Sequence, residues 1–423
     1  MTFFEFEDED RVLKRSQIRQ LVDVLAADIS GSSDSSGTRK KYEVFLTGSG
    51  TGGSLNYVTS SLFHTVFDQT HTLQTANEML DITIGSYAKY KAGTSTTDPE
   101  YYVCFKDQSS TPITAITASV DSSNKPVFSS HLLMMREKIN IYKQYAQVLL
   151  GDGSQYFTTP YDDDVTNDDE TRINHAIFIN IKRLFTRDGL DKEKFSMKIG
   201  KKAGDGTASQ AIDAVSTTLS LISDTNAKSS LTVTPQGGSV GTIVDSTNDD
   251  VGLLFYENGI IVLDAEKVLD HSQVITGNIS AVVATPGGNA PTNGIKTIES
   301  NSKFIPDIWI TGSIDDVVDH IAGTRFGSAD TSAMGLINKT SINSTIYFCR
   351  VAPSEGNFST NPTYTDASGS LRCIEERGDD PFSYVTTIGL YDAPGNMLAV
   401  AKTSRPIEKN PEVDLSISVR IDY

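Results

Sequence analysis

A glycine-rich stretch near the N-terminus is the first candidate for chemistry. Gly48-Ser-Gly50-Thr-Gly-Gly53 fits G-x-G-x-x-G, whose backbone amides cradle the pyrophosphate in dinucleotide-binding proteins. Such a site needs a second strand with an acidic residue about 20 residues further on. Asp68 lies near that distance, but its segment, Phe63–Gln69, has no clear strand pattern. We therefore interpret the stretch as a loop and predict no cofactor.

A second pattern concerns a nucleophilic serine. Gly237-Gly-Ser239-Val-Gly241 fits G-x-S-x-G, the elbow that exposes the serine of many hydrolases. Asp264 and His271 follow in the order that a Ser, Asp, His triad would need. The elbow requires a helix after the serine, whereas Thr242-Ile-Val is typical of a strand. The sequence favours a hairpin-type loop, and no catalytic residue is assigned.

Metal-ligating residues are plentiful but unpatterned. An acidic cluster could offer carboxylate oxygens to Ca²⁺ or Mg²⁺, although the glycine and glutamate positions of an EF-hand do not fit. Its members are Asp162, Asp163, Asp164, Asp168, Asp169 and Glu170. We interpret the cluster as a solvated loop and leave open a weak cation site. The six histidines form no ligand motif, and Cys104, Cys349 and Cys373 are too far apart for a zinc or disulfide framework. The sequence thus predicts no metal site.

The charge balance restricts the partners. The 423 residues include 36 Lys and Arg against 54 Asp and Glu, a net charge of −18. Nucleic acid and anionic membranes repel such a chain, and no dense basic run offsets this. No apolar run reaches the roughly 18 residues of a membrane span. We expect no nucleic-acid partner and no membrane insertion. The acidic start is unlike a basic secretory signal and favours synthesis and retention in the cytoplasm.

The elements that must position any surface begin with an amphipathic segment. Helical spacing of apolar residues predicts a helix over Asp8–Ile29, tethered by the flexible linker Gly31–Gly37. Such a helix could pack on its own domain or on a neighbouring subunit. Its candidate contact residues are Val12, Ile18, Leu21 and Leu25.

The rest of the chain reads as helices followed by strands. The patterns predict a strand at Tyr42–Leu46 and helices at about 74–90, 132–150, 173–185 and 208–222. From about Leu231 strands dominate. Asn258-Gly259 signals a hairpin turn with positive φ at both residues, and Ser313 is placed to cap a short helix.

The C-terminus reads as an antiparallel meander. Its expected strands are Ser344–Val351, Tyr384–Tyr391, Met397–Lys402 and Val413–Tyr423. The last strand alternates fully, which places its apolar residues on one face. The candidate contact residues on that face are Ile417, Val419, Ile421 and Tyr423.

These expectations combine into a multi-domain α+β chain with an antiparallel β-rich C-terminal half. We expect five segments along it. They are the tethered helix and linker (1–37), a mixed α/β domain (38–170), a helical segment (171–230), a β-rich domain with the Asn-Gly hairpin (231–340) and a C-terminal antiparallel sheet (341–423).

Several segments of the chain are distinctive. At the C-terminus these are Asn343–Arg350, Asn361–Tyr364, Tyr384–Tyr391, Leu398–Lys402 and Val419–Tyr423. Upstream they are Arg136–Gly151, Phe178–Phe185 and Leu254–Leu263. These segments resemble large virion structural proteins of contractile-tailed phages, especially phages of marine cyanobacteria. Together the patches cover about residues 130–423, and residues 1–130 lie outside the resemblance.

The resemblance implies a virion component, most plausibly a baseplate (wedge) subunit of the tail, assembled in the host cytoplasm. It implies other virion proteins as partners, several copies in a symmetric assembly and no enzymatic residues to transfer. Two alternatives stay open. One is a tail-associated hydrolase of host polysaccharide with paired carboxylates. The other is a neck, receptor-binding or fibre-attachment protein.

Overall fold

The fold is mostly antiparallel β-sheet with few helices. In the computed structural model strands account for 48% of the chain and helices for 16%, which agrees broadly with a mixed α+β class. The structure describes residues 6–32, 37–47, 57–91, 100–103, 114–116, 119–120, 126–127, 130–161, 171–200, 210–211, 219–229, 231–269, 274–280, 295–305, 309, 312–326, 331–359, 361–370 and 380–423.

The chain forms two compact units. The first, the ribbon unit, combines Met1–Ile18 with Ser341–Tyr423, and the second, the core unit, is Arg19–Thr340. Strands β1 (Arg11–Leu25) and β20 (Ser332–Val351) each contribute residues to both units. The finer division into five segments stays a prediction.

One large sheet organises the core unit. Its strand order is β1-β20-β11-β13-β15-β16-β17-β10-β4-β3-β2, with β14 paired to β15. The bounds are β2 Arg39–Thr47, β3 Tyr57–Phe67, β4 Glu78–Ser86, β10 His175–Ile181, β11 Ser196–Gly200, β13 Leu219–Ser223, β14 Thr232–Thr234, β15 Gly238–Val244, β16 Asp250–Phe255 and β17 Ile260–Asp264.

Short strands form smaller sheets in the same unit. They are β5 Ala88–Lys91, β6 Glu100–Val103 and β7 Thr114–Ile116; β8 Ser119–Val120 and β9 Pro126–Val127; and β12 Gln210–Ala211, β18 Val274–Ser280 and β19 Ile295–Lys303. The helices are α1 Ala26–Ser30, α2 Ser130–Leu149, α3 Arg183–Thr186, α4 Ala265–Val268 and α6 Ile314–Thr324.

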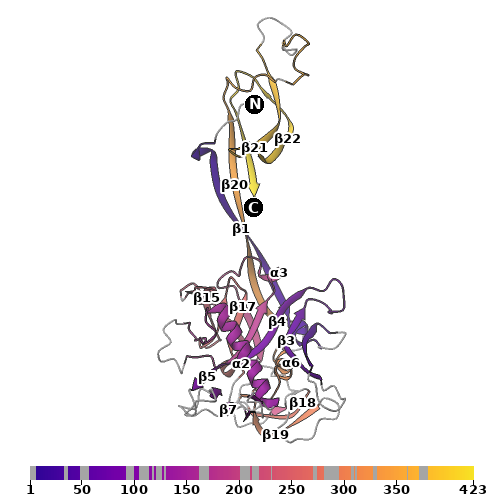
Figure 1. Cartoon of the computed structure of the whole chain (residues 1–423), viewed down its shortest axis with the longest axis vertical. Coiled ribbons are helices and arrows are strands. Elements are labelled where there is room, and N and C mark those ends of the chain that lie inside the picture. Colours follow the sequence, from indigo (N-terminus) through magenta and orange to yellow (C-terminus); the bar gives the residue numbers. More distant parts are fainter. Residues whose placement is uncertain are drawn as a thin grey trace. The chain divides into compact units, whose positions relative to one another are not determined.

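Helices α2 and α6 cover opposite faces of β4 (Figure 1). A Cβ atom at Gly85 would lie 3.0 Å from the Tyr142 backbone nitrogen and 3.1 Å from the Lys138 carbonyl, so this residue faces α2 and only glycine allows the approach. Neighbouring Ser86 points to the other face, where Trp309 and α6 lie, because successive strand residues alternate. The central strands β4, β10 and β17 are thereby buried on both sides, at nearly every position.

The ribbon unit is built differently. Its strands β1, β20 and β23 (Leu415–Asp422) lie side by side in one sheet, while β21 (Ser383–Tyr391) and β22 (Met397–Lys409) form a separate pair. Among its described residues only Leu390 and Val419 are buried apolar side chains. A buried cation takes the place of an apolar centre: the Nζ atom of Lys409 donates to Asn357 Oδ1 at 2.8 Å and to two backbone carbonyls.

The N-terminal helix prediction was wrong. Residues Asp8–Asp10 form a 3₁₀ turn, the strand β1 follows, and only Ala26–Ser30 are helical. Val22 and Val24 are buried and Leu21 and Leu25 exposed, which is strand alternation. Pairing with β20 overrides the local helical spacing, since a strand neighbour far along the chain is invisible to periodicity.

Three other helix predictions were wrong for the same reason. The segments 74–90, 173–185 and 208–222 contain the strands β4, β10 and, in their described part, β12 and β13. Runs such as Ile177–Ile181 are apolar except at Asn180, so strand and buried helix look alike. The strand at Tyr42–Leu46 and the helix at 132–150 were confirmed.

The turn prediction was confirmed in part and the cap prediction in full. The residues Asn258 and Gly259 do join two antiparallel strands, β16 and β17, but through a four-residue loop in which Gly259 has φ +67° and Asn258 is not left-handed. The Oγ of Ser313 accepts from the Asp316 amide at 3.0 Å and caps α6, as expected.

The C-terminal strands were confirmed, but the meander was wrong. The last strand, β23, pairs with β20, not with its sequence neighbour β22. The alternation of β23 was confirmed, with Val419 buried, Ile417 and Ile421 half-buried, and the intervening residues exposed.

Candidate functional site

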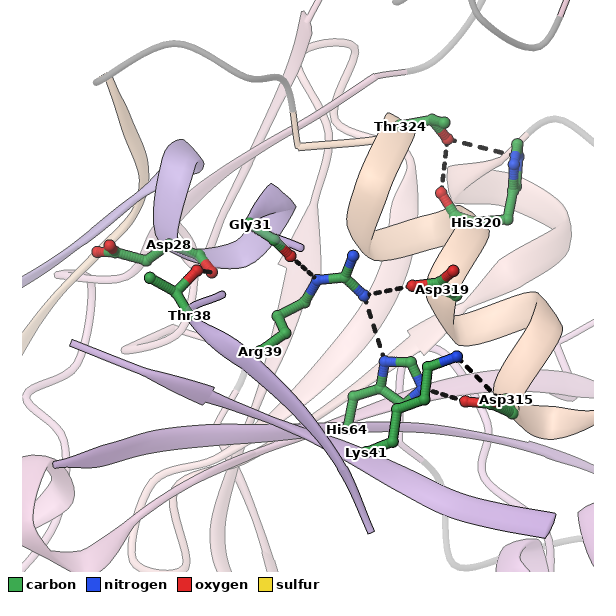
Figure 2. A network of polar contacts seen from close by, with 10 residues as sticks. All are labelled: Asp28, Gly31, Thr38, Arg39, Lys41, His64, Asp315, Asp319, His320 and Thr324. Carbon is green, nitrogen blue, oxygen red and sulfur yellow. Dashed lines mark hydrogen bonds and ion pairs between the residues drawn. The ribbon is translucent and has the colours of Figure 1, made fainter. Parts of the chain in front are cut away.

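A cluster of buried and half-buried polar and charged side chains joins β2, β3 and α6 (Figure 2). The Arg39 guanidinium on β2 donates to Asp319 Oδ1 at 2.8 Å, and Lys41 Nζ lies 3.1 Å from Asp315 Oδ2. Between them His64, on β3, contacts Asp315 Oδ1 through Nε2 at 2.5 Å. Asp315 and Asp319 are four residues apart and so share one face of α6. We call these five residues the α6 clasp.

The protonation state of the clasp follows from its geometry. A guanidinium can only donate, so Nδ1 of His64 accepts from Arg39 Nη1 at 3.3 Å. The ring is therefore neutral, and its Nε2–H donates to Asp315. Burial lowers the pKa of His64, and the contact with Asp315 offsets this only in part. Burial by itself would raise the pKa of Asp315, but the contacts with His64 and Lys41 leave it below its usual value.

Two further hydrogen bonds connect the start of β2, where the α6 clasp lies, to the segment around α1. Arg39 Nε donates to the Gly31 carbonyl at 2.5 Å, and Thr38 Oγ1 donates to the Asp28 carbonyl at 2.8 Å. These bonds fix the segment after α1 against the start of β2. Because both His64 nitrogens are engaged and the side chain is fully buried, the clasp holds elements together; no nitrogen of this ring is available as a general base.

A second cluster has the composition of a hydrolase triad. Trp309 Nε1 donates to Ser86 Oγ at 2.9 Å, and the same Ser86 Oγ lies within hydrogen-bond distance of His175 Nδ1, at 3.0 Å. The His175 Nε2 atom then lies 3.7 Å from Glu266 Oε1. Serine, histidine and carboxylate thus follow one another as in nucleophilic catalysis.

Accessibility decides against catalysis at this cluster in the present conformation. Ser86 and His175 are both 0% exposed, and Trp309 packs edge-on against the His175 ring at 5.7 Å between centroids. A nucleophile needs space for a substrate carbonyl beside it, and the indole occupies that position. The cluster instead connects β4, β10 and Trp309, whose side chain is itself fully buried.

A buried lysine forms the third polar feature. Lys138, on α2, is 0% exposed, and its Nζ donates to the carbonyl oxygens of Trp309 and Gly312. Burial lowers the pKa of Lys138 to about 7. The ammonium ties α2 to the segment that leads into α6.

The sequence-derived chemical candidates are not brought together. A β14–β15 hairpin does form here, but Ser239 lies on the strand β15 opposite Val233, not in the loop, and donates to Glu257 at 3.3 Å. Asp264 is the buried cap of α4, accepting from the Glu266 amide at 3.1 Å. His271, the Gly48–Gly53 stretch and the acidic cluster 162–170 lie outside the described residues. In the part of the chain that the structure describes, no group of three or more His, Cys, Asp or Glu could hold a metal ion.

Sequence reasoning missed all three buried clusters. Ser86 and His175 stand directly opposite in the β4–β10 register, and His64 faces α6 over a separation of 251 residues. A strand register of this kind leaves no local signal. Of the elements that form these clusters, the sequence indicated α6 through its cap, Ser313.

The interaction candidates are mostly exposed, on two faces of β1. Val12 and Ile18 are 45% and 56% exposed, and Leu21 and Leu25 are 69% and 36% exposed. The even-numbered pair and the odd-numbered pair point to opposite sides of the strand. On β23, Val419 is buried and Tyr423 is 71% exposed. Their part in contacts stays a prediction.

Comparisons with protein-family models, with curated proteins and with solved structures found no match to this chain. The resemblance of its segments to phage virion proteins therefore stays an expectation. Among the described residues, no helix is long and apolar enough to cross a membrane.

Proposed function

We propose that this chain is a structural subunit of a tailed-phage virion, most plausibly of the contractile-tail baseplate, and that it acts by packing against other virion proteins. One observation carries the packing role. The described part of the ribbon unit buries only Leu390 and Val419 as apolar side chains, yet it exposes a series of large ones. On β21–β22 these are Tyr384, Tyr391, Met397, Leu398 and Val400.

The physical argument concerns stability. A two-stranded sheet is marginal in water, and exposed apolar side chains that cluster mark a surface awaiting a partner. Covering the side chains of β21–β22 would supply the burial that this unit lacks. The phage assignment has separate support, namely the resemblance of the C-terminal segments, four of which lie in or beside β20–β23.

Fewer observations support the two alternatives, a polysaccharide hydrolase and an attachment protein. A polysaccharide hydrolase needs two carboxylates flanking a sugar-sized cleft. The open groove lined by Asn140, Gln144 and Gln147 on α2 offers amides and no carboxylate. A neck, fibre-attachment or receptor-binding role would use the same exposed strands and differs only in the neighbour.

The test is incorporation into particles, with a matched surface control. Leu398→Asp changes a side chain that is 70% exposed in the ribbon unit, and Val233→Asp one that is 69% exposed in the core unit. We expect wild type and Val233→Asp to be found in purified particles in a fixed copy number, and Leu398→Asp to be depleted at least about tenfold. Absence of the wild-type chain from particles would overturn the virion assignment. Equal incorporation of both variants would overturn the packing role.

A further inference from the structure

The C-terminal strand β23 leaves one edge open. Its ladder in the described structure is with β20 alone, from Ser344 opposite Asp422 to Val351 opposite Leu415. Asn343 and Tyr423 exchange both backbone hydrogen bonds, at 3.2 and 2.8 Å. Antiparallel ladders alternate with period two, so the odd-numbered residues of β23 bond to β20. The amides and carbonyls of the even-numbered residues, from Ser416 to Asp422, therefore point away from β20.

The sequence along this edge has a symmetric pattern of side-chain size and a complementary pattern of charge about its centre. Residues 414–420 are Asp-Leu-Ser-Ile-Ser-Val-Arg, centred on Ile417. Serine matches serine, Leu415 matches Val419, and an acid matches a base. We infer that β23 pairs antiparallel with β23 of a second copy of this chain, with a two-fold axis at Ile417.

Each pair formed by residues 414–420 in this register is complementary. Asp414 faces Arg420 of the second copy, and the reverse pair repeats this contact across the axis. Opposite charges in directly facing positions stabilise a ladder, whereas like charges weaken it. Ser416 faces Ser418 of the second copy, and these even-numbered residues are the ones whose backbone groups are open. Ile417 meets its own counterpart in a pair without backbone bonds, where side chains approach most closely.

Neighbouring registers fit less well. Shifting the axis to Ser418 places Asp414 against Asp422 of the second copy. Shifting it to Ser416 needs Glu412 in extended backbone opposite Arg420, but residues 410–413 form a turn closed by the Val413 amide on the Asn410 carbonyl at 3.2 Å. In the favoured register, centred on Ile417, the like-charged residues Glu412 and Asp422 of the second copy would face each other. Glu412 lies in the turn at residues 410–413, outside the paired strands. Asp422 already accepts from Arg420 and Ser344, both at 2.7 Å.

A second copy is therefore a better occupant than an unrelated strand. The edge supplies both the donors and the acceptors that its own copy needs, in register with charge and side-chain size. The inference deepens the proposed function and rests on it, since it names the partner at one of the surfaces through which the subunit would assemble.

Charge exchange tests the pairing on the full-length chain. Asp414→Arg places Arg against Arg twice in a homodimer, and Arg420→Asp places Asp against Asp twice. Mixed one to one, the two variants restore both opposite-charge pairs in a heterodimer. We expect the wild type to dimerise in light-scattering measurements over a concentration series. Each variant alone should dimerise about tenfold more weakly, and the mixture should recover wild-type affinity.

Controls separate this edge from general charge effects. Glu408→Arg and Arg405→Asp make the same charge changes at exposed positions of β22 and should leave dimerisation unchanged. A wild type that stays monomeric, or a mixture no stronger than its components, would overturn the pairing. Incorporation of the wild type into particles, measured in parallel, distinguishes this outcome from failure of the proposed function. If the wild-type chain is found in particles but stays monomeric in solution, the pairing of β23 is overturned and the proposed function is not.

Discussion

The core unit and the ribbon unit differ in how much of their side-chain surface they bury. In the core unit the central strands are buried at nearly every position, and the buried Lys138 is held by two backbone carbonyls and Arg39 by Asp319. In the ribbon unit the strands are long and paired, but most of their side chains face solvent. The backbone ladder satisfies hydrogen bonds in both units, whereas only the core unit gains the hydrophobic burial that usually dominates folding. This difference is the physical basis of the proposal that the ribbon unit makes contacts with partners after folding.

The largest effect should come from the aromatic centre of the core unit. Phe178 is 0% exposed and stacks on Tyr145 with 4.1 Å between centroids. Phe178→Ala should lower the free energy of unfolding by about 3–5 kcal/mol, through lost transfer energy and a cavity. Fluorescence of Trp309, the single tryptophan, reports the core unit during urea unfolding. Leu398→Ala, in the ribbon unit, should change the same transition by less than about 0.5 kcal/mol. Similar losses of unfolding free energy for Phe178→Ala and Leu398→Ala would contradict the contrast between the core unit and the ribbon unit.

The next effect should come from the α6 clasp. Asp319→Ala leaves the Arg39 guanidinium, whose side chain is 4% exposed, without its carboxylate. We expect a loss of about 2–3 kcal/mol in the Trp309 transition, below the full cost of a broken buried pair because Asp319 itself reaches solvent.

A matched aspartate provides the control for the clasp. Asp191 is as exposed as Asp319, at 20%, but its partner Arg19 is 60% exposed. Asp191→Ala should cost less than about 1 kcal/mol. An equal cost for the two variants would mean that burial of the cation does not matter and that the clasp contributes little.

A smaller effect should depend on pH. Lys138 has a pKa of about 7 in the folded protein and about 10.4 when unfolded. Between these values the unfolded chain binds a proton that the folded chain does not, so stability rises with pH. The slope is at most about 1.4 kcal/mol per pH unit.

Urea unfolding at pH 7.5 and 9.5 measures this slope. The bonds from Lys138 to two carbonyls favour the ammonium, so the rise over this interval should stay near or below about 2 kcal/mol. Lys138→Met should flatten the rise, whereas Lys198→Met, at an exposed position of β11, should keep it. A rise that persists in Lys138→Met would assign it to other groups.

Sequence patterns recovered local features and missed those set by distant neighbours. The helix α2, the Ser313 cap, the turn at Gly259 and the alternation of β23 each follow from residues within a few positions. The segment 8–29 shows the limit. Its spacing fits a helix, but β20 lies more than 300 residues away and imposes a strand. Likewise Ser86, His175 and Glu266 meet only because β4 and β10 pair in one register, which no motif encodes.

The smallest stability effect should come from the open edge of β23, and it carries the most information about the ribbon unit. Ser418→Pro removes an amide that points away from β20, where proline is tolerated on an edge strand. We expect the β20–β23 ladder to survive, with hydrogen exchange at residues 415–422 changed little in the monomer, while dimerisation is lost. Val419→Pro removes an amide that points toward β20, so it should open the ladder itself. If Ser418→Pro keeps the β20–β23 ladder and still dimerises, the open edge of β23 is not the contact, and the exposed faces of β21 and β22 remain as the proposed assembly surface.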